Sequence, residues 1–195
     1  MASLLLKSSL AAGLSAYAET KYGHLLFAMP SEGSVSPLFV ATPAILLGVG
    51  FFALMHGVQI GAARNKYMEL AKKDGEKDAE ARYSLPNLYV DGNSKHARAF
   101  NTIQRSHQHI FETFPSAILG GLLGAYQFPI TAAFSTLLYA SGRIALSLAY
   151  AKCEGEPSKR YDNPLARFTW YGLIGNFFLG FAAAVKCLMT VKFAS

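Results

Sequence analysis

A stripe of polar side chains leads into an apolar segment within FNTIQRSHQHIFETFP, residues 100–115. Arg105, His109 and Glu112 follow one another at helical spacing, so they lie on one face of a helix, and Asn101 precedes them by one turn. A guanidinium group binds a carboxylate bidentately, and a carboxylate can hold an ammonium group. This face therefore predicts a site for a small anionic or zwitterionic, peptide-like ligand. The alternative is an internal ion pair between Arg105 and Glu112 that only stabilises the protein.

A second polar set lies inside the apolar segment at residues 130–151. Arg143 stands four residues after Tyr139 and seven before Tyr150, which also places these side chains on one helix face. A charge at membrane depth costs about 2.5–3.5 kcal/mol on insertion scales, so it usually faces other protein groups. We expect Arg143 and Tyr150 to face the same polar pocket as the first stripe. The alternative is an arginine whose head group extends to the membrane surface.

Three further cations lie beside apolar segments. Arg64 follows the first segment, and Lys159 and Arg160 follow the third. Such residues commonly mark only the side of the membrane on which a loop lies. They become candidate site residues because they are expected on the same side of the membrane as Arg105.

Other chemistries lack their residue patterns. The sequence contains no HExxH metal motif, nucleophile elbow, phosphate-binding loop or dinucleotide-binding loop. His107 and His109 point to different faces of a helix, and the two cysteines are far apart, so we expect neither a metal site nor a disulfide. The net charge of +6 comes without any DNA- or RNA-binding signature, which argues against a nucleic-acid partner.

The elements that must position these groups are apolar helices. Hydrophobic residues make up 52% of the chain and charged residues 15%, whereas soluble domains carry about 25% charged residues. The long apolar runs predict an all-α membrane protein, a four-transmembrane-helix bundle in residues 38–195. The predicted spans are residues 38–63, 100–126, 130–151 and 168–191, joined by a polar connection at 64–99, a tight turn at 127–129 and a polar loop at 152–167.

Residues 1–37 are predicted to form an N-terminal extension, with a short apolar helix at 2–18 and a loop at 22–37. A retained amphipathic helix, an uncleaved anchor and a weak targeting signal all fit this segment. The two polar connections are rich in lysine and arginine, and the tight turn has none. In a four-span topology both connections lie on one side, which the positive charge indicates to be cytosolic. We expect the endoplasmic reticulum membrane, with a mitochondrial membrane as the alternative.

Several motifs resemble the MAPEG family, the membrane-associated proteins in eicosanoid and glutathione metabolism. They are FNTIQRSHQ followed by ETFP, AARNKY after the first span, GR within the third span and GEPSKR in the next loop. The resemblance covers about residues 45–190 and is closest to the microsomal glutathione S-transferase type-3 group. It implies a homotrimer of four-helix protomers. Glutathione, the co-substrate, binds between neighbouring protomers near the cytosolic face, and lipophilic substrates enter from the membrane lipids.

Carried onto this chain, the resemblance implies a set of residues that hold glutathione: Arg64, Arg105, His109, Glu112, Arg143 and Tyr150. Either Lys159 or Arg160 falls near the family's catalytic arginine, which stabilises the glutathione thiolate. A neighbouring cation lowers the pKa of a thiol, and the thiolate is the nucleophile. The implied function is that of a membrane-bound glutathione transferase or peroxidase acting on lipophilic electrophiles or lipid hydroperoxides.

A second hypothesis is a catalytically inactive MAPEG-like subunit, which binds lipid or has a structural role in a larger membrane protein complex. The N-terminal extension favours it. So does Leu146, which stands three residues after Arg143, where active relatives often carry tyrosine. A channel or transporter is the third reading, and the lack of an inverted repeat counts against it.

Overall fold

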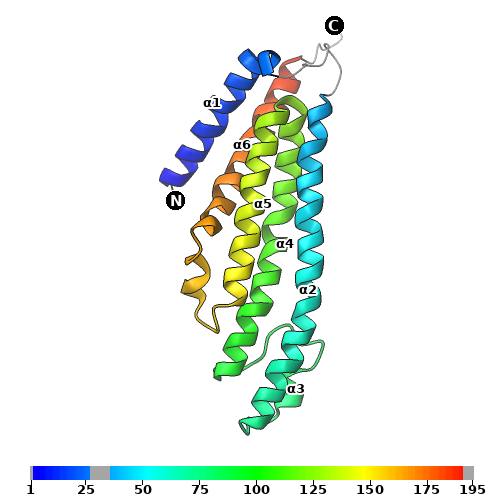
Figure 1. The fold of residues 1–195 in the computed structure, drawn as a ribbon, viewed down its shortest axis with the longest axis vertical. Coiled ribbons are helices and arrows are strands. Elements are labelled where there is room, and N and C mark those ends of the chain that lie inside the picture. Colours follow the sequence, from blue (N-terminus) through cyan, green and yellow to red (C-terminus); the bar gives the residue numbers. More distant parts are fainter. Residues whose placement is uncertain (1, 27–35, 191–195) are drawn as a thin grey trace.

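The protein is a bundle of long helices. The computed structural model describes residues 2–26 and 36–190, and in these ranges it contains helices, turns and loops but no strand. Four bundle helices run side by side along the longest axis, with α1 against one flank (Figure 1). The long helices are α1 (Ala2–Leu26), α2 (Ala41–Lys73), α4 (Lys95–Gln127), α5 (Pro129–Ala151) and α6 (Phe168–Thr190), and the short ones are η1 (Pro37–Val40), α3 (Ala79–Tyr83), η2 (Pro157–Tyr161) and η3 (Pro164–Arg167).

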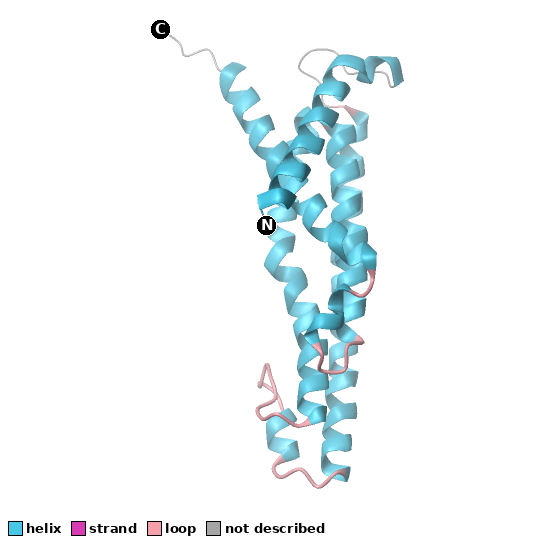
Figure 2. Ribbon diagram, turned by 90° about the vertical axis from the view of Figure 1, so that its left-hand side faces the viewer, coloured by secondary structure: helices cyan, strands magenta, loops and turns pink. Residues whose placement is uncertain are grey.

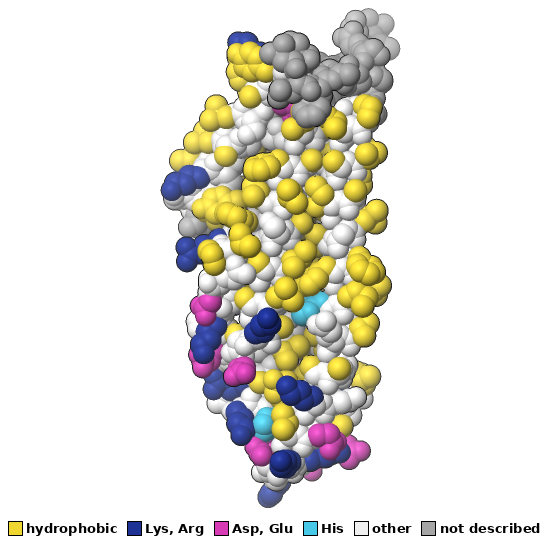
Figure 3. All heavy atoms as spheres, in the orientation of Figure 1, with side chains coloured by type: hydrophobic (Ala, Val, Ile, Leu, Met, Phe, Trp, Pro, Cys, Tyr) yellow, Lys and Arg dark blue, Asp and Glu magenta, His cyan; other side chains and the backbone are white. Residues whose placement is uncertain are grey.

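Three helical segments are long and apolar enough to cross a membrane: Pro37–Lys73, Pro129–Ala151 and Pro164–Thr190. Apolar side chains cover the upper part of the surface, and charged side chains gather at the lower end (Figure 3). The apolar side chains Leu47, Val58 and Phe181, for example, are 74%, 67% and 71% exposed. A soluble protein rarely exposes so much contiguous apolar surface, so this chain is an integral membrane protein. Helix α4 is not one of these three segments, because its first half carries charged residues. The fourth membrane span therefore stays a prediction.

Three predicted boundaries are wrong. The connection expected at 64–99 begins ten residues later, since α2 continues to Lys73, and ends five residues earlier, since α4 begins at Lys95. The last turns of α2, AARNKYMELAKK, contain many strong helix formers. Ala71 in these turns packs against α3 and the start of α4. The N-terminal helix is also longer than expected, because α1 reaches Leu26. The rest of the predicted loop, residues 27–35, lies outside the described residues, as does residue 191 at the end of the last predicted span. The turn at 127–129 is confirmed, since α4 ends at Gln127 and α5 begins at Pro129.

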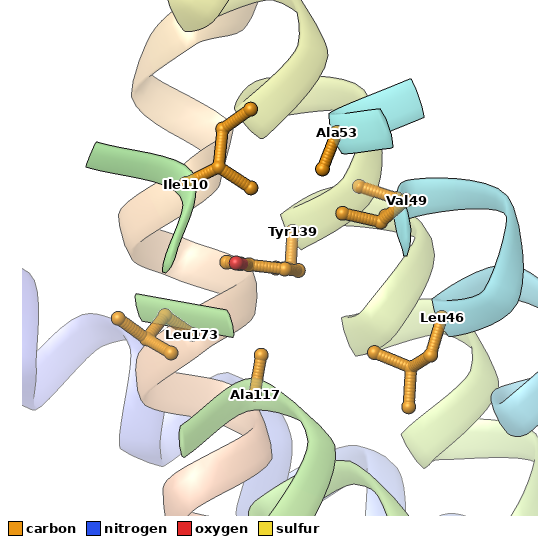
Figure 4. Packing of buried hydrophobic residues seen from close by; sticks show 8 residues of the cluster. Leu46, Val49, Ala53, Ile110, Ala117, Tyr139 and Leu173 are labelled. Carbon is orange, nitrogen blue, oxygen red and sulfur yellow. The ribbon is translucent and has the colours of Figure 1, made fainter. Parts of the chain in front are cut away.

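The core at mid-height joins α2, α4, α5 and α6 around Tyr139. Its ring is fully buried among side chains such as Val49, Ile110 and Leu173 (Figure 4). Helix α6 approaches α5 so closely at Gly142 and Gly172 that a Cβ at either position would collide with backbone atoms. Small residues allow this close approach of membrane helices. The resulting contacts hold the polar ends of α4, α5 and α6 in fixed relation.

Helix α1 crosses α6 on the outer side of the bundle (Figure 2). Ala12 and Ala16 pack against Leu179 and Ala183 of α6. Glu19 is 7% exposed, and its carboxylate accepts hydrogen bonds from the backbone N–H groups of Ile130 and Thr131, both at 2.8 Å, and from the Thr131 hydroxyl at 2.7 Å. A carboxylate at a helix N-terminus satisfies unpaired N–H groups and complements the helix dipole. This cap fixes α1 to the start of α5.

Candidate ligand-binding site

The polar stripe predicted on residues 100–115 lies along the charged half of α4. Ser94 caps the start of this helix by accepting a hydrogen bond from the backbone N–H of Ala97. Asn101, the first member of the stripe, exchanges two hydrogen bonds of 2.9 Å with the backbone of Val90. Its amide is therefore used to hold the α3–α4 connection against α4, which is a structural role that the sequence analysis did not foresee.

Arg105 and Glu112 form a bidentate ion pair on the surface of α4. One guanidinium nitrogen is 3.0 Å from its carboxylate oxygen, and the second pair of atoms is also in contact. The two side chains are 38% and 46% exposed. The ion pair between Arg105 and Glu112, the alternative to a ligand site, is thus formed. Its exposure leaves both groups open to a ligand from outside the bundle.

Arg143 is the largest fully buried side chain of the described chain, and it faces α4. It donates hydrogen bonds of 3.0 Å to the carbonyl oxygen and to Nδ1 of His109. Since a guanidinium group can only donate, Nδ1 of His109 must be the acceptor. Nε of Arg143 has no hydrogen-bond partner among the described residues. No carboxylate of the described residues forms a salt bridge with Arg143. This is an arginine with an incomplete set of partners.

Thr113 links Arg143 to the core. Its hydroxyl oxygen accepts a hydrogen bond of 3.3 Å from Arg143 and lies 3.0 Å from the Tyr139 hydroxyl. Tyr139 therefore supports Arg143 from within the bundle. Leu146 is also fully buried, so the position where active relatives often carry tyrosine is apolar core in this chain.

The connection between α5 and α6 closes the other side of the site. The Arg160 guanidinium lies over the rings of Tyr150 and Tyr161, at 5.5 and 5.1 Å from their centroids. The Tyr161 hydroxyl accepts a hydrogen bond of 3.1 Å from the indole N–H of Trp170. The Trp170 ring in turn lies 6.2 Å from the His109 ring. The predicted residues Tyr150 and Arg160 are thus connected to His109 by a series of contacts through Tyr161 and Trp170.

One charge cluster results from these contacts. Arg105, Glu112, Arg143 and Arg160 all act electrostatically on the His109 ring. Three guanidinium groups accompany a single carboxylate, so the cluster carries a surplus of positive charge. We call these residues, with Tyr150, Tyr161 and Trp170, the polar cluster.

Arg64 does not belong to the polar cluster within one chain. Its guanidinium donates a hydrogen bond of 3.0 Å to the carbonyl oxygen of Tyr83 and lies 4.7 Å from the centroid of the Phe100 ring. Phe100 and Arg105 are five positions apart, which is about 140° around α4. Arg64 lines a separate pocket of about 710 Å³ with Gln104 and His107.

Lys159 also points away from the polar cluster. Its ammonium group pairs with Glu156 at 2.9 Å, and this pair raises the pKa of Lys159 and lowers that of Glu156. Lys159 lines another pocket, of about 390 Å³, with Lys152 and Asp162. Of the two cations that the sequence left open, Arg160 is the one in the cluster.

Sequence reasoning missed Tyr161 and Trp170. Aromatic residues are common where helices meet a membrane surface, so neither of them stood out. The available signal was that the only tryptophan of the chain follows the basic loop directly.

A comparison with protein-family models gives a match. The model described as the MAPEG family matches residues 36–185, and this range contains α2, α4, α5, most of α6 and every residue of the polar cluster. Helix α1 lies outside the matched range.

Proposed function

Because this chain belongs to the MAPEG family, we propose that it binds glutathione and acts as a membrane-bound glutathione transferase or peroxidase on lipophilic electrophiles or lipid hydroperoxides. Within the family we propose a place near the microsomal glutathione S-transferase type-3 group, on the motifs FNTIQRSHQ and GEPSKR. The endoplasmic reticulum membrane is the proposed location.

The observation that carries this proposal is the incomplete pairing of Arg143. A buried guanidinium without a carboxylate is costly, and the partners of Arg143 are a carbonyl, an imidazole and a hydroxyl group. Arg105 and Arg160 add positive charge nearby. An anionic ligand would supply the missing negative charge. Glutathione carries two carboxylates and one ammonium group, which match the guanidinium groups and the carboxylate of Glu112.

The cluster also suits activation of a thiol. A free thiol has a pKa of about 8.5, and an adjacent arginine lowers that pKa by stabilising the thiolate. Arg160 is the proposed catalytic residue, since it belongs to the cluster whereas Lys159 pairs with Glu156. Tyr150 and Tyr161 orient its guanidinium by lying against it. At an electrophilic carbon of a lipophilic molecule from the membrane, the thiolate forms a thioether and displaces the leaving group as an anion. At a hydroperoxide it breaks the O–O bond: the lipid alcohol is released, and glutathione becomes a sulfenic acid that a second glutathione converts to glutathione disulfide and water.

The position of Arg64 supports assembly into a homotrimer. Arg64 and Arg105 lie on different sides of α4, so both reach one ligand only if Arg64 comes from a neighbouring copy. His107 lines the same pocket as Arg64 and would accompany it. In the assembly that we propose, each ligand is held by the polar cluster of one protomer and the Arg64 side of the next.

Turnover assays test this function directly. The purified protein, supplied with glutathione, should conjugate a hydrophobic aryl halide or reduce a fatty-acid hydroperoxide. Arg160→Leu should lower kcat, and Lys159→Leu should leave kcat within about twofold. Activity that is unaffected by Arg160→Leu would show that the reaction occurs elsewhere.

The inactive-subunit hypothesis remains as the second candidate, and a specific feature favours it. Helix α1 is fixed to the bundle by Glu19, and its outward face exposes Leu6, Leu10 and Leu14. Such a face can pack on another membrane protein. Binding of glutathione without a thiolate signal and without turnover would favour this candidate.

A further inference from the structure

A pocket of about 430 Å³ lies between α1, α5 and α6. Phe134 and Leu138 of α5 and Phe168 and Tyr171 of α6 supply most of its apolar wall, and α1 closes it. Its volume falls within the usual range for small-molecule sites. The α1 wall belongs to the segment outside the family match, so the site does not depend on glutathione binding.

One end of the pocket carries the single charged side chain of its lining, and we call it the polar end. Lys7 is exposed and lines the pocket, and it forms no salt bridge with any described residue. Ser8 lines it too, and its hydroxyl oxygen is buried without a hydrogen-bond partner in the described part of the chain. An unsatisfied buried hydroxyl group is costly. A lone ammonium group beside it indicates an anionic ligand.

The polar end lies toward the basic end of the bundle. Helices α1 and α6 run in the same direction (Figure 1), and Gly13 faces the Phe178 ring. Lys7 is therefore about 9 Å below that contact, toward Phe168, where α6 begins after the basic loop. A ligand with its charge at Lys7 extends its apolar part toward the middle of the membrane, as an amphiphile in a bilayer does.

We propose that α1, α5 and α6 form a binding site for one fatty-acid molecule. The hydrocarbon chain occupies the pocket, the carboxylate pairs with the ammonium group of Lys7, and the Ser8 hydroxyl donates a hydrogen bond to it. A single chain with a single negative charge matches one narrow pocket with one cation. The cap that Glu19 places on α5 holds α1 where it can form this wall.

Photolabelling of the full chain in phosphatidylcholine nanodiscs tests the site. The probe is palmitic acid with a diazirine at the end of its chain, and labelled peptides are identified by mass spectrometry. Label is expected on the peptides that contain Phe134 and Gly175, which line the pocket away from Lys7. Unlabelled palmitic acid should compete at least about tenfold better than hexadecanol, which has the same chain without the charge, since a hydrogen-bonded ion pair contributes about 1.5–3 kcal/mol.

Three variants separate charge from shape. Lys7→Gln should abolish the preference for palmitic acid over hexadecanol. Ala11→Phe should fill the pocket and reduce labelling at least about tenfold. Leu14→Phe is the matched control on the same helix, because Leu14 is 70% exposed and does not line the pocket; its labelling should stay within about twofold.

Equal competition by palmitic acid and hexadecanol in the unmodified protein would overturn the proposal. So would equal labelling of the same peptides by a diazirine phosphatidylcholine, since a chain of bulk lipid would then occupy the pocket. Lys7→Gln removes no packed side chain. It therefore keeps the charge test decisive even if Ala11→Phe displaces α1.

Discussion

Glu19 and Arg143 are both buried charges, one at the start of α5 and the other about 20 Å further along this helix, and their surroundings differ. The Glu19 carboxylate receives three hydrogen bonds from the start of α5, so its pairing is complete within the described chain. Arg143 has three neutral acceptors and an unpartnered Nε, and Glu112, the carboxylate that acts on it electrostatically, is itself paired with Arg105. A charge whose partners are all present stabilises the fold. A charge that lacks partners indicates where a ligand of opposite sign belongs.

The largest effect should come from Arg105→Ala. Removing this guanidinium should weaken glutathione binding by about 10- to 150-fold, because a hydrogen bond to a charged group contributes about 1.5–3 kcal/mol. Stability should change little, since an exposed ion pair contributes about 0–1 kcal/mol. Calorimetric titration and a thermal melt measure the two quantities. Affinity retained within a few-fold would show that the polar cluster does not bind glutathione.

Arg143→Leu should weaken glutathione binding more than it disturbs insertion into the membrane. The substitution removes the buried charge that has the fewest partners. It leaves the hydrogen-bond acceptors of His109 and Thr113 without their donor, and the Thr113 hydroxyl group can in part replace that donor. Yield from membranes, helix content and glutathione affinity should be measured side by side. A variant that fails to fold would assign Arg143 a structural role and remove the contrast with Glu19.

Glu19→Ala should act on stability alone. It leaves the N–H groups of Ile130 and Thr131 without their acceptor, at a cost of about 2 kcal/mol. Hydrogen exchange in α1 should increase, and glutathione affinity should stay within about twofold. Glu19→Gln keeps an acceptor oxygen and should be intermediate. A large loss of glutathione affinity with α1 still docked would contradict the independence of the polar cluster from the Glu19 cap.

The smallest effect concerns Cys153, a thiol of the chain itself near the polar cluster. It is 3% exposed and donates a hydrogen bond of 2.9 Å to the carbonyl oxygen of Tyr150. Burial raises the pKa of the Cys153 thiol, so it stays protonated at neutral pH, and the thiolate fraction grows only as the pH rises above the usual value for cysteine. In a Cys187→Ser background, alkylation should be slow at neutral pH and faster in alkali. Rapid labelling at neutral pH would mean that the cluster also activates this thiol.

Apolar periodicity was enough to predict much of the fold. Helices α5 and α6 lie almost where their sequences place them, because proline and polar loops bound two long apolar runs. The ends of α1 and α2 were missed for the opposite reason. The last turns of α2 are polar, and contact with α3 and the start of α4 keeps them helical, while α1 continues through the polar residues 19–21. Local pattern carries little information about such tertiary support.

The candidate site was predictable where helical spacing alone places a residue. Arg105, His109 and Glu112 share a face of α4 because of their spacing. The direction of Arg64 depends instead on Phe100, a partner from a distant segment, and that of Lys159 on the fold of the α5–α6 connection, in which it pairs with Glu156. The contacts of Trp170 with Tyr161 and His109 likewise arise from the crossing of α6 over α4 and α5.

Calorimetric titration of the detergent-solubilised protein with glutathione, with thiolate absorbance recorded in parallel, tests the central claim most directly. We predict saturable binding with a thiolate signal near neutral pH, lost in Arg105→Ala and retained in Lys159→Ala. No binding at millimolar glutathione would contradict the assignment of the polar cluster as a glutathione site.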